Sequence, residues 1–439
     1  MLALLALSAA SPARADQDVL AGFSPNTDVT QHSRIDLDQK NMETALAADD
    51  FMTAYRWYSV GGNSVKGSGA NRTIQGFSTG AVPKMVGSKW MEVYARYHGT
   101  QGAPMYNYAD VFTSDACLGQ GQFAGVDQVA KKELCKKGSA YQNVWMYVVW
   151  EMQDAIDDCL GGDLSNNGAA VHAWDEAVAF YVGSLEGTDG SGAGVLGYAL
   201  AEKRAPQFGT ANSDGSAIVN AEVMDLFKDG QSKLLAGKCA EVETVRDKIV
   251  AQITVPLVQG ALRYALLTDP AGPIRQGAKG QAEGWAFAIA VLPQINRCNP
   301  TVAAEIRENL QYPNPQGPMV DGYRYVKQQF ESVYSCMGIT CDSVGGLLNG
   351  NEGYFDGMEP CRDPSSSSSS NNDDDDDKLS GGAVAGIVIA VFVVLAALGG
   401  AAFWCGRRHE KHQTLLDQPK GKAVGGSSVM EEQKAQSAV

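Results

Sequence analysis

Apolar residues recur along much of the chain with the spacing of amphipathic helices. Positions i, i+3, i+4 and i+7 are apolar in four segments, at 142–158, 171–185, 242–268 and 279–295. Alternating apolar and polar positions, which are typical of strands, are scarce. Glycine-rich stretches at 161–169, 187–197, 212–215 and 269–277 separate the helical segments. The pattern predicts an all-α protein with long loops.

Two of the helical segments resemble each other. Glu176 and Phe180 in the first correspond to Glu283 and Phe287 in the second, and each segment follows a long apolar helix. This similarity predicts a duplicated helical bundle, with halves near 35–210 and 211–350. Chance similarity over so short a stretch is the alternative.

Both ends of the chain carry targeting signals. Residues 1–15 are apolar and end in a small-x-small cleavage sequence, which predicts a signal peptide. Residues 383–404 are uncharged and long enough to span the ~30 Å hydrocarbon core of a bilayer. Basic residues follow at once, so we expect the tail at 405–439 to be cytoplasmic. A Ser- and Asp-rich stalk at 365–380 would then connect the membrane to an extracellular domain at 16–364.

Composition agrees with export and narrows the function. The formal net charge is −15, which argues against a nucleic-acid partner and favours cations as ligands. Eight of the nine cysteines precede the stalk, and an even number in an exported domain predicts disulfides. Their pairing stays open, although Cys117/Cys135 and Cys336/Cys341 are close enough in sequence for local loops. Asn71 begins the one N-glycosylation sequence.

One helical segment carries the best candidate for a metal site. His172, Asp175 and Glu176 are spaced i, i+3 and i+4, so they share one face of a helix. Imidazole and carboxylate groups suit iron among other transition metals. Glu283, from the similar segment, would complete the site across a pseudo-twofold axis. The alternative is an ordinary helix start, where the macrodipole favours acidic residues.

Other motifs in the sequence have simpler explanations. Tyrosines and His98 cluster near Asp110 and would suit a hard trivalent cation, but aromatic residues after an amphipathic helix usually pack. Ser78 stands in a G-x-S-x-G sequence that lacks the parallel sheet of a hydrolase. A G-x-G-x-x-G sequence at 192–197 lacks the preceding strand that dinucleotide binding needs. The clustered tyrosines are Tyr94, Tyr97, Tyr106 and Tyr108.

Four sequence stretches resemble a known family. They read RTIQGFS at 72–78, HAWDEAVAFYVGSLEG at 172–187, TVPLVQG at 254–260 and CMGITC at 336–341. Over roughly residues 35–346 the chain resembles the iron-assimilating, low-iron-inducible periplasmic proteins of algae. It is most similar to their membrane-anchored relatives, the phytotransferrins.

The resemblance implies ferric-iron capture at the plasma membrane, with carbonate as a synergistic anion and internalisation by endocytosis. Endocytic adaptors and a ferric reductase would be partners, and no enzymatic activity is implied. Tyr181, a phenol within the matching stretch, joins the candidate ligands. The alternative functions are a metal-free adhesion or structural protein of the cell surface and an extracellular serine hydrolase that uses Ser78.

Overall fold

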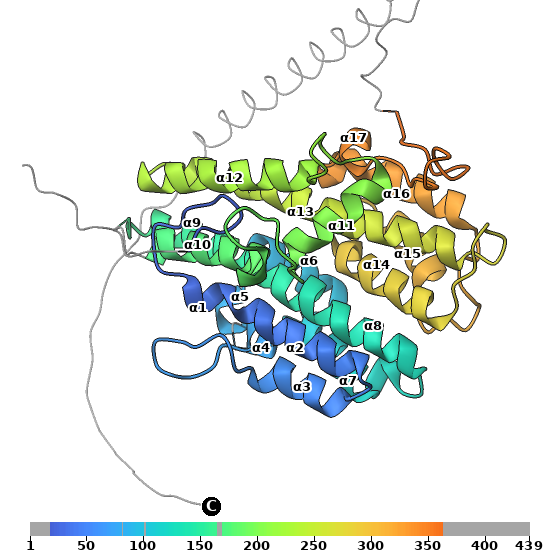
Figure 1. The fold of residues 1–439 in the computed structure, drawn as a ribbon, viewed down its shortest axis with the longest axis horizontal. Coiled ribbons are helices and arrows are strands. Elements are labelled where there is room, and N and C mark those ends of the chain that lie inside the picture. Colours follow the sequence, from blue (N-terminus) through green and yellow to red (C-terminus); the bar gives the residue numbers. More distant parts are fainter. Residues whose placement is uncertain (1–17, 81, 101, 165–168, 363–439) are drawn as a thin grey trace, which may run out of the picture. The chain divides into compact units, whose positions relative to one another are not determined.

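The fold was taken from a computed structural model, which describes residues 18–80, 82–100, 102–164 and 169–362. These residues form helices joined by loops, with isolated β-bridges but no named strand among them (Figure 1). The helices are α1 (Thr30–Ser33), α2 (Ile35–Ala47), α3 (Phe51–Val60), α4 (Ile74–Thr79), α5 (Val82–Met85), α6 (Lys89–His98), α7 (Tyr108–Leu118), η1 (Gly121–Phe123), α8 (Gln128–Gly138), η2 (Ser139–Val144), α9 (Trp145–Leu160), α10 (Ala169–Val182), η3 (Ser184–Glu186), α11 (Gly197–Phe208), α12 (Ile218–Leu235), α13 (Cys239–Thr268), α14 (Ala278–Cys298), α15 (Pro300–Leu310), α16 (Tyr323–Met337) and α17 (Cys341–Val344).

The four helices expected from apolar periodicity are present as α9, α10, α13 and α14. The mostly helical fold is therefore confirmed for the described residues. The glycine-rich stretches fall between helices, as expected. The predicted signal peptide, stalk, membrane span and tail lie outside the described residues, as do residues 16 and 17 after the predicted cleavage.

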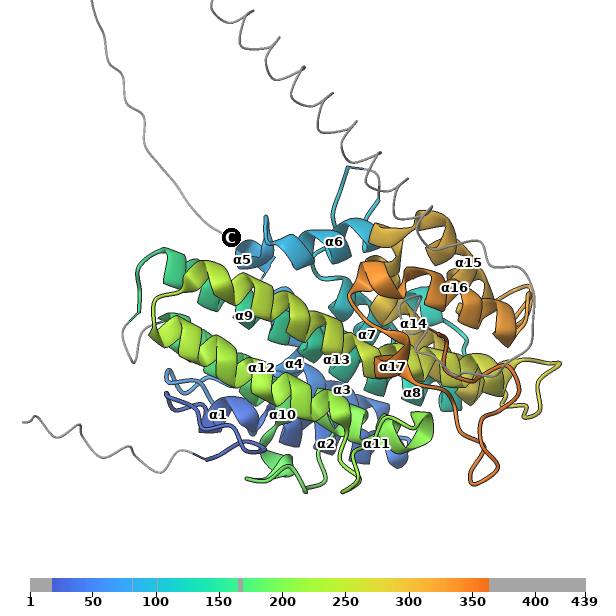
Figure 2. The ribbon, with the colours of Figure 1, turned by 90° about the horizontal axis from the view of Figure 1, so that it is seen from above.

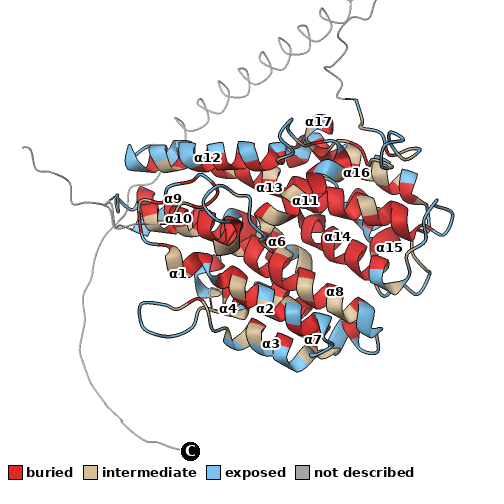
Figure 3. Cartoon of the chain, viewed as in Figure 1, coloured by how far each residue is buried: buried red, intermediate tan, exposed pale blue. Residues whose placement is uncertain are grey.

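Two helix pairs form the centre of the domain. Helix α9 packs against α10, α13 packs against α14, and α9 also contacts α13. Helix α12 lies along α13 and contacts α10 (Figure 2). Buried residues follow α13 and α14 along most of their length, whereas α12 exposes its outer side (Figure 3). Each of the two similar sequence segments thus lies in a helix that packs on the long helix before it; the duplication itself stays a prediction.

A π-helical turn joins helix α8 to helix α9. Helix α8 continues through η2, which is π-helical, into α9 without a break. Such turns insert an extra residue, which rotates the following helix relative to the preceding one, and they are frequent at functional sites. Here the turn lies between two lysines near the end of α8, Lys136 and Lys137, and the polar residues Tyr147 and Glu151 of α9.

Disulfides connect neighbouring elements of the domain. Cys117–Cys135 closes the local loop considered from the sequence, whereas Cys336 and Cys341 pair with other partners rather than with each other. Cys159–Cys239 connects the end of α9 to the start of α13. Multiple disulfides are typical of exported proteins. The four bonds are Cys117–Cys135, Cys159–Cys239, Cys298–Cys336 and Cys341–Cys361.

Among the described residues, α13 is the one helix long and apolar enough to cross a membrane. However, 89% of its apolar window is buried inside the domain. It is therefore a core helix of the domain, with its apolar surface covered by α9, α12 and α14.

Candidate metal centre

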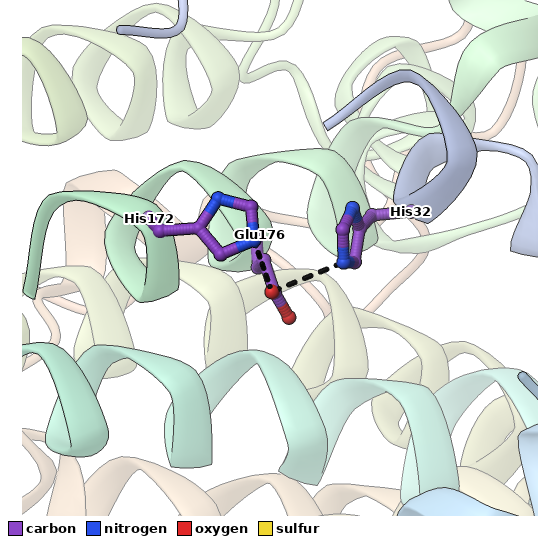
Figure 4. A group of neighbouring side chains, drawn as sticks. All are labelled: His32, His172 and Glu176. Atoms are coloured by element: carbon purple, nitrogen blue, oxygen red, sulfur yellow. Dashed lines mark ion pairs between the residues drawn. The ribbon is translucent and has the colours of Figure 1, made fainter. Parts of the chain in front are cut away.

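Two imidazoles and one carboxylate converge where α1 contacts α10. The Nε2 atoms of His32 and His172 lie 3.0 and 2.9 Å from the same oxygen, Oε1 of Glu176. One donor atom from each residue falls within 4.8 Å of the others, which makes the group a candidate metal site. Figure 4 shows the two rings approaching the carboxylate from different elements. The side chain of His172 is 36% exposed, so the group is accessible from solvent.

Helix α10 is held rigidly by its neighbours. Its Ala- and Val-rich sequence favours close helix packing, and eleven of its fourteen residues are buried. Trp174 faces α12 at Gly230, where an added Cβ would stand 2.0 Å from the indole ring. The indole Nε1 also donates to the carbonyl oxygen of Phe227, 2.9 Å away. The helix ends before Gly183, whose φ of 82° favours glycine. These contacts fix the position from which His172 and Glu176 project.

A hydrogen-bond chain determines which nitrogen of His172 faces Glu176. The Thr27 hydroxyl lies 2.8 Å from Nδ1 of His172 and donates to Oδ2 of Asp175 at 2.9 Å. Because a hydroxyl has one proton, Thr27 must accept from the Nδ1–H of His172. The Nε2 atom then faces Oε1 of Glu176 at 2.9 Å, a contact that needs a proton between the two atoms. An orienting partner of this kind is typical of metal-binding histidines.

The site is electrostatically balanced without a metal. Burial alone would raise the pKa of Glu176, but hydrogen bonds from His172 and His32, together with their charges, hold that pKa well below its usual range. The hydrogen bond to Glu176 raises the pKa of His172. Burial lowers the pKa of His32, although Glu176 opposes that shift. The two imidazoles therefore favour the ionised form of Glu176, and Glu176 in turn favours the protonated form of His172.

Two further oxygen donors lie beside this group on α9. Glu151 is buried, and both burial and the neighbouring Glu176 raise its pKa well above the usual value. Tyr147 and Glu176 lie close enough to its carboxyl group to influence this pKa through hydrogen bonding. Burial, followed by the charge of Glu151, raises the pKa of Tyr147 as well. Tyr147 stacks on Phe77, with ring centroids 4.0 Å apart and planes 4° apart, so its position is constrained.

One cationic side chain, that of Arg72, lies beside these donor groups. Arg72 is close enough to Glu176, Tyr147 and Glu151 for their charges to raise its pKa, although burial lowers it overall. Its Nη1 donates to the Ser64 hydroxyl at 3.0 Å, and its guanidinium lies 5.9 Å from the centre of the Phe180 ring. A fixed, partly buried arginine beside the donor group offers planar hydrogen bonding to a small oxyanion.

The sequence-predicted site residues are only partly brought together. His172 and Glu176 lie in one group, as expected from their spacing. Asp175 is not part of this group; it accepts hydrogen bonds from Thr27 and Gln231. The Tyr181 hydroxyl is buried and donates to Oδ1 of Asn220 at 2.7 Å.

Glu283 does not join this group. It lies in a separate cavity, where its Oε1 is 2.7 Å from Nζ of Lys137. The expectation of one site across a pseudo-twofold axis is therefore not met among the described residues. The reason is local: basic residues on α8 and α11 face Glu283, whereas histidines face Glu176.

Sequence reasoning did not include His32, Glu151 and Tyr147. His32 lies in a four-residue helix without a periodic pattern, although it is one of only three histidines before the predicted stalk. Tyr147 and Glu151 are spaced i, i+4 in the segment at 142–158. The strongest signal in that segment is its apolar periodicity, which predicts a packed helix rather than a site. A search for polar residues on the apolar face of that helix would have found them.

The tyrosine cluster packs rather than opening toward a ligand. The Tyr94 hydroxyl donates to the Ala290 carbonyl at 2.9 Å, and Tyr108 stacks on His98 with centroids 4.2 Å apart. Burial lowers the pKa of His98 to about 3, so its imidazole is neutral. Asp110 accepts hydrogen bonds from neighbouring side chains, including the Tyr58 hydroxyl at 2.9 Å.

The remaining candidate residues are placed as follows. Ser78 lies within α4 and accepts the backbone N–H of Asp110 at 3.1 Å, and it forms no hydrogen bond to a histidine among the described residues. This geometry gives no support to a hydrolase. Asn71 is exposed, and its amide donates to the Val60 carbonyl at 3.1 Å. Its glycosylation stays a prediction.

Comparison with known proteins gives one result. Neither the curated proteins nor the solved structures include a significant match to this chain. A family model, described as "low iron-inducible periplasmic protein" (Fea1), matches residues 1–351, which is well over half of the sequence. The chain carrying this histidine–carboxylate group therefore belongs to the low iron-inducible periplasmic protein family.

Proposed function

We propose that the protein captures ferric iron at the cell surface through His32, His172 and Glu176, with Glu151 and Tyr147 as further donors. Family membership supports a role in iron acquisition. The observation that carries the site is the convergence of two Nε2 atoms on one carboxylate oxygen. Imidazole suits iron, and carboxylate and phenolate oxygens are hard, anionic donors for a trivalent cation.

The donor set favours the ferric over the ferrous ion. Glu176, Glu151 and Tyr147 would supply three anionic oxygens when deprotonated, which balances the charge of Fe³⁺. Carbonate is proposed as the synergistic anion, next to Arg72, whose guanidinium lies close to the same carboxylates. Asp175, Tyr181 and Glu283 are engaged elsewhere in the domain and are not included in this donor set.

Membrane attachment and uptake form the second part of the proposal. The apolar segment at 383–404 would anchor the chain in the plasma membrane, with the domain outside and the tail at 405–439 in the cytoplasm. Endocytosis through adaptors that bind this tail, and release with the help of a ferric reductase, would complete the uptake route. These steps follow from the family resemblance and the sequence.

Iron stoichiometry in defined variants tests the site. The purified full-length protein would be loaded with ferric nitrilotriacetate and bicarbonate, desalted, and assayed for iron per chain by mass spectrometry. We expect one bound ferric ion, with a visible phenolate-to-iron absorption band that Tyr147→Phe removes. His32→Ala, His172→Ala and Glu176→Gln should each weaken binding by more than about 100-fold, since losing even an outer-shell partner costs about 10–100-fold.

Glu241→Gln is the matched control, because Glu241 is exposed and pairs only with Lys238 on the surface. It should bind iron like the wild type. If folded His32→Ala, His172→Ala and Glu176→Gln all bind iron like the control, the proposed ligands are wrong. A wild-type protein that binds no iron at all would instead favour the metal-free surface protein.

A further inference from the structure

A polar cavity, separate from the candidate metal centre, lies where α2, α8, α11 and α14 approach one another. Its volume is about 170 Å³, and we call it the basic cavity. Four cationic side chains line it, together with Glu43 and Glu283. The cations are Lys136, Lys137, Lys203 and Arg204.

The two lysines of α8 are neutralised by carboxylates. Nζ of Lys136 lies 3.1 Å from Oε2 of Glu133. Nζ of Lys137 lies 2.5 Å from the same oxygen and 2.7 Å from Oε1 of Glu283. Lys279, at the start of α14, adds a further positive charge 3.6 Å from Glu133. Glu133 and Glu283 are thus already engaged by this set of lysines, whereas Glu43 accepts a hydrogen bond from Gln39.

The two cations of α11 form no direct ion pair within the described part of the chain, although the charge of Glu283 acts on both. Arg204 is only 2% exposed, its Nη1 donates to Oε1 of Gln207 at 2.6 Å, and its guanidinium lies 5.1 Å from the centre of the Phe287 ring. Its buried Nε has no hydrogen-bond partner. Lys203 makes no ion pair within the described part of the chain, and the nearby charges of Arg204, Lys137 and Lys136 add to burial in lowering its pKa.

A buried cation without a counter-ion is costly, because desolvation is not offset by pairing. Arg204 is buried, forms no direct ion pair among the described residues, and is only partly compensated by the charge of Glu283. An anion in the basic cavity would supply the missing acceptors for Arg204 and Lys203 at once. The arginine fork is well suited to the paired oxygens of an oxyanion.

We propose that the basic cavity is a binding site for a small inorganic oxyanion of the phosphate class, held by Lys203 and Arg204. The volume supports a small ligand, since organic ligand pockets usually measure about 300–1,000 Å³. The cavity is built from α8, α11 and α14, whereas the candidate metal centre is built from α1, α9 and α10. This inference therefore does not rest on the proposed iron function.

Calorimetric titration of the iron-free, full-length protein with inorganic phosphate tests the proposal. We expect one phosphate per chain. Lys203→Gln should weaken phosphate binding at least about tenfold, while Lys203→Arg, which keeps the charge, should stay within about threefold of the wild type. Lys203 is exposed at its cavity edge, so neither substitution threatens the fold. Lys228→Gln, at an exposed lysine paired with Asp225, is the matched control and should bind like the wild type.

Competition by sulfate and bicarbonate identifies the preferred oxyanion. Binding of any of the three that Lys203→Gln weakens supports the site. Binding of none of them by the wild type, or equal binding by wild type and Lys203→Gln, overturns it. Glu176→Gln, which removes a proposed iron ligand, should bind phosphate normally. A failure of the iron proposal is therefore distinguishable from a failure of this one.

Discussion

Iron affinity should rise steeply with pH, because several candidate ligands are protonated in the absence of metal and ferric iron must displace those protons. Glu151 holds one, since burial and the charge of Glu176 raise its carboxyl pKa well above the usual value. The phenol of Tyr147 holds a second. The third lies between Nε2 of His172 and Oε1 of Glu176, which are 2.9 Å apart. Ligands must be deprotonated to bind a metal, so binding should release up to three protons.

The magnitude follows from this proton count. Each proton released in the binding step changes the apparent affinity tenfold per pH unit. Two to three protons therefore predict an increase of about 100- to 1,000-fold between about pH 6 and 7. The same relation predicts marked weakening of iron binding between about pH 6 and 4.5, the range of an acidifying vesicle.

Competition with ferric nitrilotriacetate at several pH values measures this slope, after correction for protonation of the chelator and with bicarbonate held constant. Glu151→Gln and Tyr147→Phe should each lower the slope by about one proton, because each removes one stored proton. Glu241→Gln should leave it unchanged. An affinity that is constant across this range, or a slope that neither substitution lowers, would refute the reasoning and leave reduction to the ferrous state as the release step to test.

Three further predictions concern single residues near the site or elsewhere in the domain. Thr27→Val, which removes the hydroxyl that orients His172, should weaken iron binding about 10–100-fold in the same competition, and Thr27→Ser should restore it. Arg72→Gln should abolish the dependence of iron affinity on bicarbonate, measured by titration with and without that anion; a dependence equal to wild type would exclude Arg72 as its partner. Burial raises the pKa of Glu186 from 4.5 to about 7, so the cost of ionising it in the folded domain builds up between about pH 4.5 and 7 and is complete above pH 7. Glu186→Gln should accordingly increase the free energy of unfolding in urea by about 1–3 kcal/mol near pH 8, and the gain should fade as the pH drops toward about 4.5; the same gain at both pH values would contradict this assignment.

The helices were predictable because each one buries one face, which places apolar residues at helical spacing along the sequence. Segment 171–185 was expected to be helical, and the structure has α10 at Ala169–Val182. The same periodicity places His172 and Glu176 one turn apart, so their meeting could also be predicted. His32 could not be placed, because it reaches Glu176 only through the tertiary contact of α1 with α10.

Sequence similarity between the two segments predicted equivalent glutamates, but not their surroundings. Glu176 meets two histidines, whereas Glu283 meets Lys137, which comes from a helix far away in the sequence. The partner of a buried carboxylate is decided by which helix packs opposite it. The sequence around each glutamate does not show which helix packs opposite it. The different partners of Glu176 and Glu283 could therefore not be predicted from either segment.

Anomalous diffraction at the iron edge, from crystals of the iron-loaded protein, tests the central claim most directly. We expect one strong peak per chain between His32, His172 and Glu176, within about 2–2.3 Å of both Nε2 atoms and of a Glu176 oxygen. Glu151 and Tyr147 should turn their oxygens toward it. An iron peak elsewhere in the domain, with Glu176 still paired to both histidines, would contradict the proposed site.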